Sequence, residues 1–254
     1  MKVVILQHNI VWANPMENQA RLEQEIDRQP GADLYVLAEM WSTGYAPKPE
    51  DVAERDGASL QWMQRMAGKY NAAIAGSIAV EENGEFRNRL YFVKPDGSVE
   101  YYDKRHLFTY GGEHLQFTRG EHRVVVEWRG VRFLLEICYD LRFPVWSRNC
   151  GDYDAILYVA SWPTPRIEAW RTLLRARAIE NQCYVIGGNR VGEDPNCKYC
   201  GCSAIIDPYG RTLAECERDE ECRAESLIDT EALTAFREKF PVLRDRDDYT
   251  IRGI

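Results

Sequence analysis

Short apolar runs of strand length recur along the whole chain and constrain its fold more than any other feature. Apolar runs this short, bounded by turn residues, are typical of buried strands. No internal repeat, low-complexity tract or linker breaks their succession. The predicted strands are residues 3–6, 34–37, 72–78, 90–93, 99–102, 124–127, 132–137, 155–159, 184–188, 203–206 and 226–228.

Helical patterns occupy several of the gaps between the predicted strands, at residues 18–27, 60–70 and 167–181. The third pattern is the clearest, and we interpret it as a core helix with one solvated face. Its apolar residues at helical spacing are Trp170, Leu173, Leu174 and Ile179.

Turn sequences at residues 83–84, 95–98 and 207–210 join neighbouring strands, so parts of the sheets are expected to be antiparallel. Strands and helices mixed in this way predict the α/β class. The periodicity leaves open whether the core contains one sheet or two.

Three of the predicted strands are followed by a residue with catalytic chemistry: Glu39, Lys104 and Cys138. Taken singly, a charged residue at a strand end is more often an ordinary solvated charge. The three occur at separate strand ends in the order Glu, Lys, Cys.

Cys138 ends an apolar run and precedes a polar turn and Pro144, a residue typical of a helix start. A thiol at such a junction is lifted out of the sheet into a pocket, and the first amides of the helix face any negative charge that develops there. The position therefore favours a nucleophile. The alternative is that Cys138 is a small core residue, as most cysteines are.

The order of these motifs resembles that of the nitrilase, or carbon–nitrogen hydrolase, superfamily, and the resemblance runs from residue 1 to about residue 249. It assigns Glu39 as general base, Lys104 as catalytic lysine and Cys138 as nucleophile. Glu113, just after a Gly-Gly turn, matches a second glutamate that orients the lysine. Within the superfamily the chain is most similar to bacterial omega-amidases. The supporting segments are residues 143–149, 160–166, 176–182 and 240–243.

The resemblance implies hydrolysis of a non-peptide carbon–nitrogen bond without a metal or an organic cofactor. Glu39 would take the thiol proton of Cys138, because free cysteine is mostly protonated at neutral pH. The ammonium of Lys104 and the backbone amide of Tyr139 would stabilise the oxyanion. Ammonia would leave a thioester on Cys138, and a water activated by Glu39 would release the acid.

The omega-amidase branch implies a small-molecule substrate, a short dicarboxylate monoamide such as 2-oxoglutaramate. The far carboxylate of such a substrate needs a cation or several donors in the pocket. Arg142 and Arg166 are the candidate cations, and Trp162 is a candidate wall. The alternative for Arg142 is a structural salt bridge to Asp140 or another acidic residue.

The superfamily fold implied by the resemblance is a four-layer α-β-β-α sandwich, which here would be one domain over residues 1–254. The resemblance also implies homodimers, or higher homo-oligomers, that extend the sandwich across the interface. The charged C-terminal extension at residues 240–254 is expected to lie over a partner subunit.

Three residues depart from the superfamily pattern. Ala38 stands where proline is frequent before the glutamate, and Leu134 and Glu136 stand where small residues are common before the cysteine. Strand alternation predicts that Glu136 shares a face with Cys138. A buried carboxylate there needs a partner or a raised pKa, and it would disfavour the thiolate.

Composition excludes several classes of partner. With 45% hydrophobic residues among 254, the chain can build a sizeable core. The formal net charge is −8 and no Lys/Arg-rich run occurs, so we expect no nucleic-acid or anionic-membrane partner. The N-terminus leads directly into a strand and lacks the features of a signal peptide. No apolar window approaches a membrane span, and we therefore expect a cytoplasmic protein.

Eight cysteines are present, and in the cytosol they are expected to be reduced. Cys197, Cys200 and Cys202 have a spacing that suits soft metal ligands, but a structural zinc site needs a fourth ligand, for which Cys216 is the nearest possibility. We therefore expect no metal. In the superfamily this segment is a loop that carries Tyr-x-Gly-x-Ser before a strand.

Three other functions fit parts of the sequence. The first is another amidase of the superfamily, acting on carbamoyl amides or deaminated glutathione. The second is a thiol hydrolase that uses His106 or His114 as its base. The third is a metal-binding or interaction protein on an inactive hydrolase scaffold, suggested by the Cys197–Cys202 cluster and by Glu136.

Overall fold

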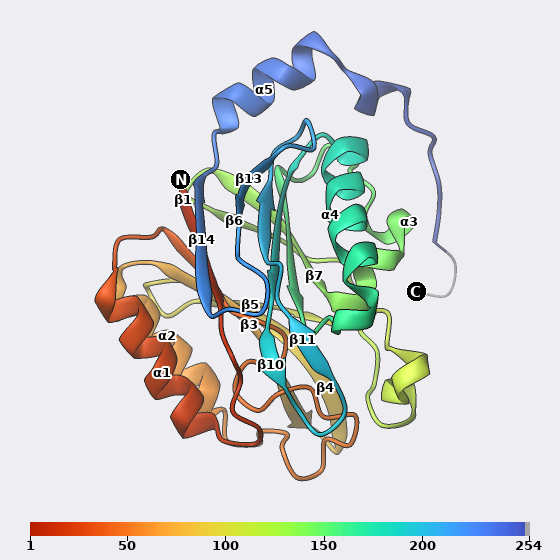
Figure 1. The fold of residues 1–254 in the computed structure, drawn as a ribbon. Helices are drawn as coiled ribbons and strands as arrows, with labels where there is room; N and C mark the ends of the chain where they lie inside the picture. The colour runs from red at the N-terminus through yellow and green to blue at the C-terminus, as the bar shows by residue number, and fades with distance from the viewer. Residues whose placement is uncertain (252–254) are drawn as a thin grey trace.

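Two six-stranded sheets pack face to face, and helices cover the outer surface of each (Figure 1). The computed structural model describes residues 1–251. The first sheet contains, in spatial order, β14 (Cys222–Leu227), β1 (Lys2–Gln7), β2 (Leu34–Val36), β3 (Ala73–Glu82), β4 (Glu85–Val93) and β5 (Val99–Asp103). The second sheet contains β13 (Thr212–Glu215), β12 (Ala204–Ile206), β9 (Tyr184–Asn189), β8 (Ala155–Ala160), β7 (Val131–Ile137) and β6 (Val125–Trp128).

The centre of each sheet is parallel and its edges are antiparallel. Strands β1, β2 and β3 run in parallel, as do β7, β8 and β9. The remaining neighbours pair antiparallel, including the three pairs joined by the predicted turns. Parallel strands have their carboxyl ends at one edge, so each sheet offers a row of strand ends where a site can form.

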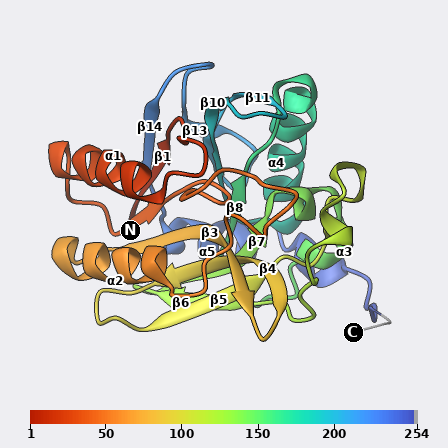
Figure 2. The ribbon, with the colours of Figure 1, turned by 90° about the horizontal axis from the view of Figure 1, so that it is seen from below.

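Helices α1 (Pro15–Arg28) and α2 (Ala58–Tyr70) lie next to each other on the outer face of the first sheet (Figure 2). Helix α1 begins where its sequence predicts, because the side chain of Asn14 accepts a hydrogen bond from the Glu17 amide and Pro15 occupies the first turn. On the second sheet lie α3 (Pro144–Ser147) and α4 (Ile167–Asn181), and α5 (Thr230–Lys239) follows the last strand.

Helix α4 confirms the predicted range and most of the predicted core face. Trp170 and Leu174 are fully buried against the second sheet, together with Ala178 one turn later. Ile179 was expected on this face but is 51% exposed. It lies one residue beyond Ala178, which turns its side chain about 100° away from the buried face.

The core between the sheets fixes their relative position. Alternate residues of β7 point into it: Phe133, Leu135 and Ile137 belong to this core, whereas Leu134 packs toward α4. The rings of Phe92 and Phe133 meet across the two sheets with centroids 5.8 Å apart. Two further apolar clusters lie under the helices, so the four-layer α-β-β-α prediction is confirmed.

Some elements had no clear sequence pattern. Strand β13 and the two strands of a separate small sheet, β10 (Val191–Glu193) and β11 (Lys198–Cys200), are only three or four residues long. Helix α5 was also missed, because only Leu233 on it is buried. Within residues 1–251 there are also five 3₁₀ turns: η1 (Thr109–Gly111), η2 (Glu113–Leu115), η3 (Cys138–Arg142), η4 (Thr164–Arg166) and η5 (Val242–Asp245).

After α5 the chain runs along the outside of the molecule toward α3 (Figure 1). The hydroxyl of Tyr249 donates a hydrogen bond to the Val145 carbonyl at 2.8 Å, which ties this segment to α3. The predicted extension at 240–254 is described as far as residue 251, and its last three residues lie outside the described range. Among the helices of residues 1–251, none combines the length and apolarity needed to cross a bilayer.

Candidate active site

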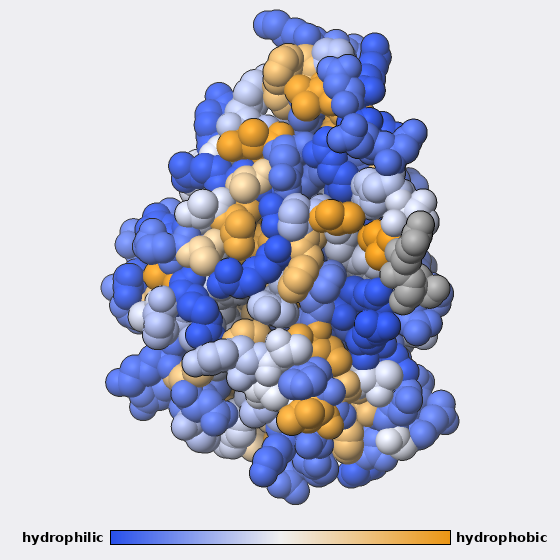
Figure 3. Space-filling view, turned by 90° about the vertical axis from the view of Figure 1, so that its right-hand side faces the viewer, coloured by the Kyte–Doolittle hydropathy of each residue, from blue (hydrophilic) through white to orange (hydrophobic). Residues whose placement is uncertain are grey.

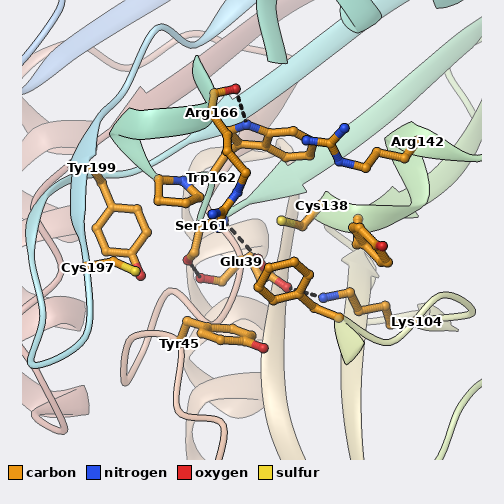
Figure 4. A pocket seen from close by; sticks show the side chains of 13 residues that line it. Glu39, Tyr45, Lys104, Cys138, Arg142, Ser161, Trp162, Arg166, Cys197 and Tyr199 are labelled. Atoms are coloured by element: carbon orange, nitrogen blue, oxygen red, sulfur yellow. Dashed lines mark hydrogen bonds and ion pairs between the residues drawn. The ribbon is translucent and has the colours of Figure 1, made fainter. Parts of the chain in front are cut away.

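Residues that follow strands of both sheets line one pocket (Figure 4). Glu39 and Lys104 follow β2 and β5 of the first sheet, and Cys138 and Ser161 follow β7 and β8 of the second. All four line a cavity with an empty volume of about 440 Å³. The three residues predicted from successive strand ends are therefore brought together in space.

Lys104 forms ion pairs with both predicted glutamates. Its Nζ lies 2.8 Å from Glu39 Oε1 and 2.9 Å from Glu113 Oε2. All three side chains are at most 1% exposed. The amide of Phe108 donates a further 2.6 Å hydrogen bond to Glu113, which anchors that carboxylate on the loop before η1.

Glu39 is held by partners from both sheets. Asn88 Nδ2 on β4 donates to Glu39 Oε1 at 2.8 Å, and the Ser161 amide donates to Oε2 at 2.8 Å. Asn88 also reaches Glu113 at 3.3 Å, so one amide connects the two carboxylates. These contacts fix the orientation of the Glu39 carboxylate.

Cys138 leaves the sheet through an unusual backbone conformation. Its φ is +46°, in the left-handed region, and η3 begins at this residue. Such a backbone is uncommon for a residue with a side chain and is often found at functional sites. Here it turns the thiol away from the direction that strand alternation would give it and into the pocket.

The electrostatics of the pocket keep the thiol protonated at rest. Burial raises the pKa of Cys138 well above its usual value, and the charge of Glu39 raises it further, while Lys104 opposes both. Burial alone would lower the pKa of Lys104, but Glu113 and Glu39 outweigh it and the pKa is raised. Attack by Cys138 therefore needs a base, and Glu39 is the carboxylate beside it.

The other predicted pocket residues also line the cavity: Tyr139, Arg142, Trp162 and Arg166. The Arg142 guanidinium lies 4.9 Å from the centre of the Trp162 ring, and that of Arg166 lies 5.3 Å from the Phe108 ring. Within residues 1–251 neither arginine has an ion-pair partner. Both cations are thus available to an anionic ligand.

The alternative salt bridge from Arg142 to Asp140 does not form. Asp140 is fully buried and is occupied by other donors. It accepts hydrogen bonds from the Tyr102 hydroxyl and the Ile137 amide, both at 2.9 Å, and lies 2.7 Å from His106 Nδ1.

Comparison with known proteins agrees with this geometry. A family model described as carbon-nitrogen hydrolase matches residues 2–238. The chain is 44% identical to the omega-amidase YafV of Escherichia coli, with 99% of this chain and 98% of the relative covered. It is 41% identical to a 2-oxoglutaramate amidase of Bacillus subtilis, with 94% and 95% covered. The chain belongs to the carbon–nitrogen hydrolase family.

A solved structure is similar to this hydrolase over nearly its whole length. It is a CN-hydrolase superfamily protein from Xanthomonas campestris with an arsenic adduct in its active site. The TM-score is 0.95 at 39% identity, with 99% of this chain and 98% of that chain covered. The assignment to the nitrilase superfamily, nearest to omega-amidases, is confirmed.

Several residues of the hydrolase's pocket were not identified from the sequence. Tyr45 lies six residues after Glu39, and its buried hydroxyl has no hydrogen-bond partner among the described residues. Asn88 lies within a strand, where no pattern distinguishes it. The remaining lining residues that were missed are Phe108, Ser161, Pro163, Cys197 and Tyr199.

Glu136 does not face the pocket of the hydrolase. It is fully buried and accepts a 3.0 Å hydrogen bond from Ser147 Oγ on α3, on the opposite side of the strand from the inter-sheet core. The left-handed backbone of Cys138 breaks the alternation that would have put both side chains on one face. Burial and the charge of Asp140 raise the pKa of Glu136 well above its ordinary value.

A Glu136→Gln variant should become more stable relative to wild type as the pH rises. Between the ordinary pKa of 4.5 and the raised folded pKa, the folded hydrolase holds one more proton than the unfolded chain. The stability from this group is complete at low pH and declines with rising pH, by up to about 1.4 kcal/mol per pH unit. Glutamine does not titrate. Urea unfolding of both proteins at about pH 5 and pH 8 measures the difference, and a pH-independent difference would contradict the argument.

The two alternative chemistries find no support in the geometry. His106 pairs with Asp140 and stacks on Phe143 with ring centroids 3.8 Å apart, and His114 is exposed; neither lines the pocket. Cys200 and Cys202 are buried under α4, while Cys197 lines the pocket. In the part of the chain that the structure describes, no three metal-binding side chains are grouped to hold an ion.

Proposed function

We propose that the protein is an omega-amidase, which hydrolyses the terminal amide of short dicarboxylate monoamides such as 2-oxoglutaramate and releases ammonia. The observation that carries the proposal is the meeting of Cys138 with the Glu39–Lys104 ion pair in one cavity that also holds two unpaired guanidinium groups. The relatives at 44% and 41% identity bear the names omega-amidase and 2-oxoglutaramate amidase.

In the first half of the reaction Glu39 removes the thiol proton as Cys138 attacks the amide carbon. Lys104 stays charged because both glutamates raise its pKa, so its ammonium stabilises the oxyanion together with the Tyr139 amide. Glu39 then gives the proton to departing ammonia and leaves a thioester on Cys138.

In the second half Glu39 removes a proton from a water that attacks the thioester, the carbon–sulfur bond breaks, and Glu39 returns the proton to the Cys138 sulfur as the carboxylic acid is released. Glu113 holds Lys104 from the far side at 2.9 Å and keeps the ammonium in place through both halves. Burial, and then Glu39, raise the pKa of Glu113, while Lys104 lowers it.

The far carboxylate of the substrate is bound by Arg142 and Arg166. Guanidinium groups bind carboxylates through paired, charge-assisted hydrogen bonds. Both groups rest against aromatic rings of the pocket, Trp162 and Phe108, which holds them at its wall. A neutral amide of the same length lacks this contact and should bind more weakly.

The test is ammonia release from a panel of amides, measured for wild type and for Arg166→Met. Wild type should hydrolyse 2-oxoglutaramate and succinamate in preference to pentanamide, carbamoyl amides and deaminated glutathione. In Arg166→Met the KM for the dicarboxylate monoamides should rise about 10- to 100-fold, the usual worth of a hydrogen bond to a charged group. The KM for pentanamide should not change.

An exposed arginine on α2, Arg65, provides the matched control, because Arg65→Met removes the same charge far from the pocket. Failure of wild type on every short dicarboxylate monoamide would exclude the omega-amidase assignment. Equal effects of Arg166→Met on charged and neutral amides would exclude the proposed carboxylate contact.

We also propose that residues 1–254 form one catalytic domain, that the protein is cytoplasmic, and that it forms homodimers or larger homo-oligomers. The face that carries α3 and α4 has hydrophobic residues scattered among hydrophilic ones (Figure 3). Val145 and Ile179 on these helices are 55% and 51% exposed, and the C-terminal extension is tied to the same side through Tyr249. Sedimentation velocity of the full chain and of a chain ending at residue 239 would test the oligomer and the role of the extension.

A further inference from the structure

The small sheet of β10 and β11 forms a wall of the pocket that the reaction described above does not use. Its strands pair antiparallel, with Gly192 opposite Tyr199. The hairpin lies outside both six-stranded sheets, and Cys197 and Tyr199 from it line the cavity. In Figure 4 these two side chains lie across the pocket from Cys138.

The side chain of Asp194 organises the tip of this hairpin. The carboxylate is 0% exposed although the neighbouring residues at the tip are exposed. One oxygen accepts hydrogen bonds from the backbone amides of Asn196 and Cys197, at 2.8 and 2.9 Å. The other accepts a 2.7 Å hydrogen bond from the Tyr199 hydroxyl. All of its hydrogen bonds therefore go to the residues that form the wall or the turn leading to it.

Arg190 also contacts the hairpin. Its guanidinium lies 4.5 Å from the centre of the Tyr199 ring and 3.7 Å from Asp194 Oδ2, and both charged side chains are 0% exposed. It also donates to the carbonyls of Ile10 and Glu193, at 3.2 and 3.1 Å. Tyr199 thus contacts a cation with its ring and a carboxylate with its hydroxyl.

We infer that this hairpin sets the length of the amide that the pocket accepts, with Cys197 as the specificity-determining side chain and Asp194 as its positioning residue. The inference rests on the proposed amidase function. The acyl chain on Cys138, whose far carboxylate Arg142 and Arg166 bind, occupies the cavity that Cys197 lines on the side opposite Cys138. Cys197 presents a small side chain there on a backbone that Asp194 fixes, so the size of residue 197 decides how much chain fits.

The test compares the values of kcat/KM for succinamate, glutaramate and adipamate, which differ by one methylene at each step. In Cys197→Ala the ratio for adipamate over succinamate should rise about tenfold, and in Cys197→Leu it should fall by a similar factor, since a pocket discriminates one methylene by about 10- to 200-fold. Cys197→Ser, nearly equal in size, should keep the wild-type ratio. Active sites are counted by the mass of the acyl adduct on the peptide that contains Cys138, because other cysteines are also free, so that poor folding does not affect the comparison.

Asp194→Ala should raise KM about tenfold and flatten the length preference, with kcat per active site within about threefold of wild type. Asp194→Asn keeps an oxygen for the two amides and should restore most of the preference, which a general loss of stability would not do. A wild-type length ratio in both Cys197→Ala and Cys197→Leu would overturn the inference.

The two proposals can fail separately. If wild type hydrolyses dicarboxylate monoamides and the Cys197 variants keep its length ratio, the inference fails and the function stands. If wild type prefers another class of amide, the omega-amidase assignment fails. The same variants are then assayed with a length series of that class, where an unchanged ratio again overturns the inference and a shifted ratio supports it.

Discussion

Replacing Glu39 by glutamine should reduce amide hydrolysis by at least about a thousandfold, within the range expected for loss of a general base. Glutamine keeps one acceptor oxygen, so it can accept the hydrogen bond from Asn88 or the one from Ser161 but not both, and it cannot take a proton. The raised pKa of Cys138 leaves almost no thiolate to react without help. Ammonia release and the intact mass of the enzyme after mixing with substrate measure both halves of the reaction, because an acyl adduct on Cys138 marks the first.

The control for this variant is His114→Asn, which removes an exposed imidazole outside the pocket and should keep wild-type turnover. Loss of turnover in His114→Asn together with an active Glu39→Gln would restore the cysteine–histidine alternative. Equal melting temperatures of the two variants would show that the difference lies in the chemistry.

Lys104→Met should have an effect of similar size on rate and a large effect on stability. Loss of a donor to the oxyanion costs about a hundred- to a thousandfold in rate. The change also leaves the buried carboxylates of Glu39 and Glu113 without their cation. Breaking a buried ion pair by removing one partner costs about 3–5 kcal/mol, measurable by urea unfolding.

A second substitution separates the two effects of Lys104→Met. Adding Glu113→Gln removes one of the two unpaired carboxylates and should recover part of the stability without recovering turnover. Lys69→Met, which breaks only exposed pairs with Glu23 and Asp27, should leave both properties nearly unchanged. Turnover of Lys104→Met within tenfold of wild type would refute the role proposed for the lysine.

The sequence predicts the main strands and the chemistry of the site well, for one physical reason. A strand that is buried on both faces must be apolar along its length, so a charged or nucleophilic residue directly after it is conspicuous. Glu39 and Cys138 follow strands of this kind, whereas Lys104 follows β5, whose Glu100 and Tyr101 are exposed, and the resemblance to a family singled out the three together. That these residues meet across two sheets depends on how the sheets pack. Hydrophobic periodicity gives no information on this packing, and the prediction of a common site came from the resemblance to a family.

The remaining pocket residues could not be found because their positions depend on local backbone geometry. Cys138 and Glu136 illustrate this: alternation put them on one face, and a single left-handed residue separated them. The β10–β11 hairpin was interpreted as a loop because its strands are three residues long and half exposed. The side chain of Asp194 is buried, but no apolar run around it in the sequence predicts this burial.

Because the site is divided between the two sheets, the rate of the reaction depends on the position of one sheet relative to the other. Glu39 and Lys104 belong to one layer and Cys138 to the other, and the bond from the Ser161 amide to Glu39 spans the seam between them. The Phe92–Phe133 contact and its neighbours set the spacing of that seam. A displacement of one layer by about the length of a hydrogen bond would separate Glu39 from the Cys138 sulfur while every strand stayed folded. A residue buried between the sheets can therefore affect turnover without contacting the substrate.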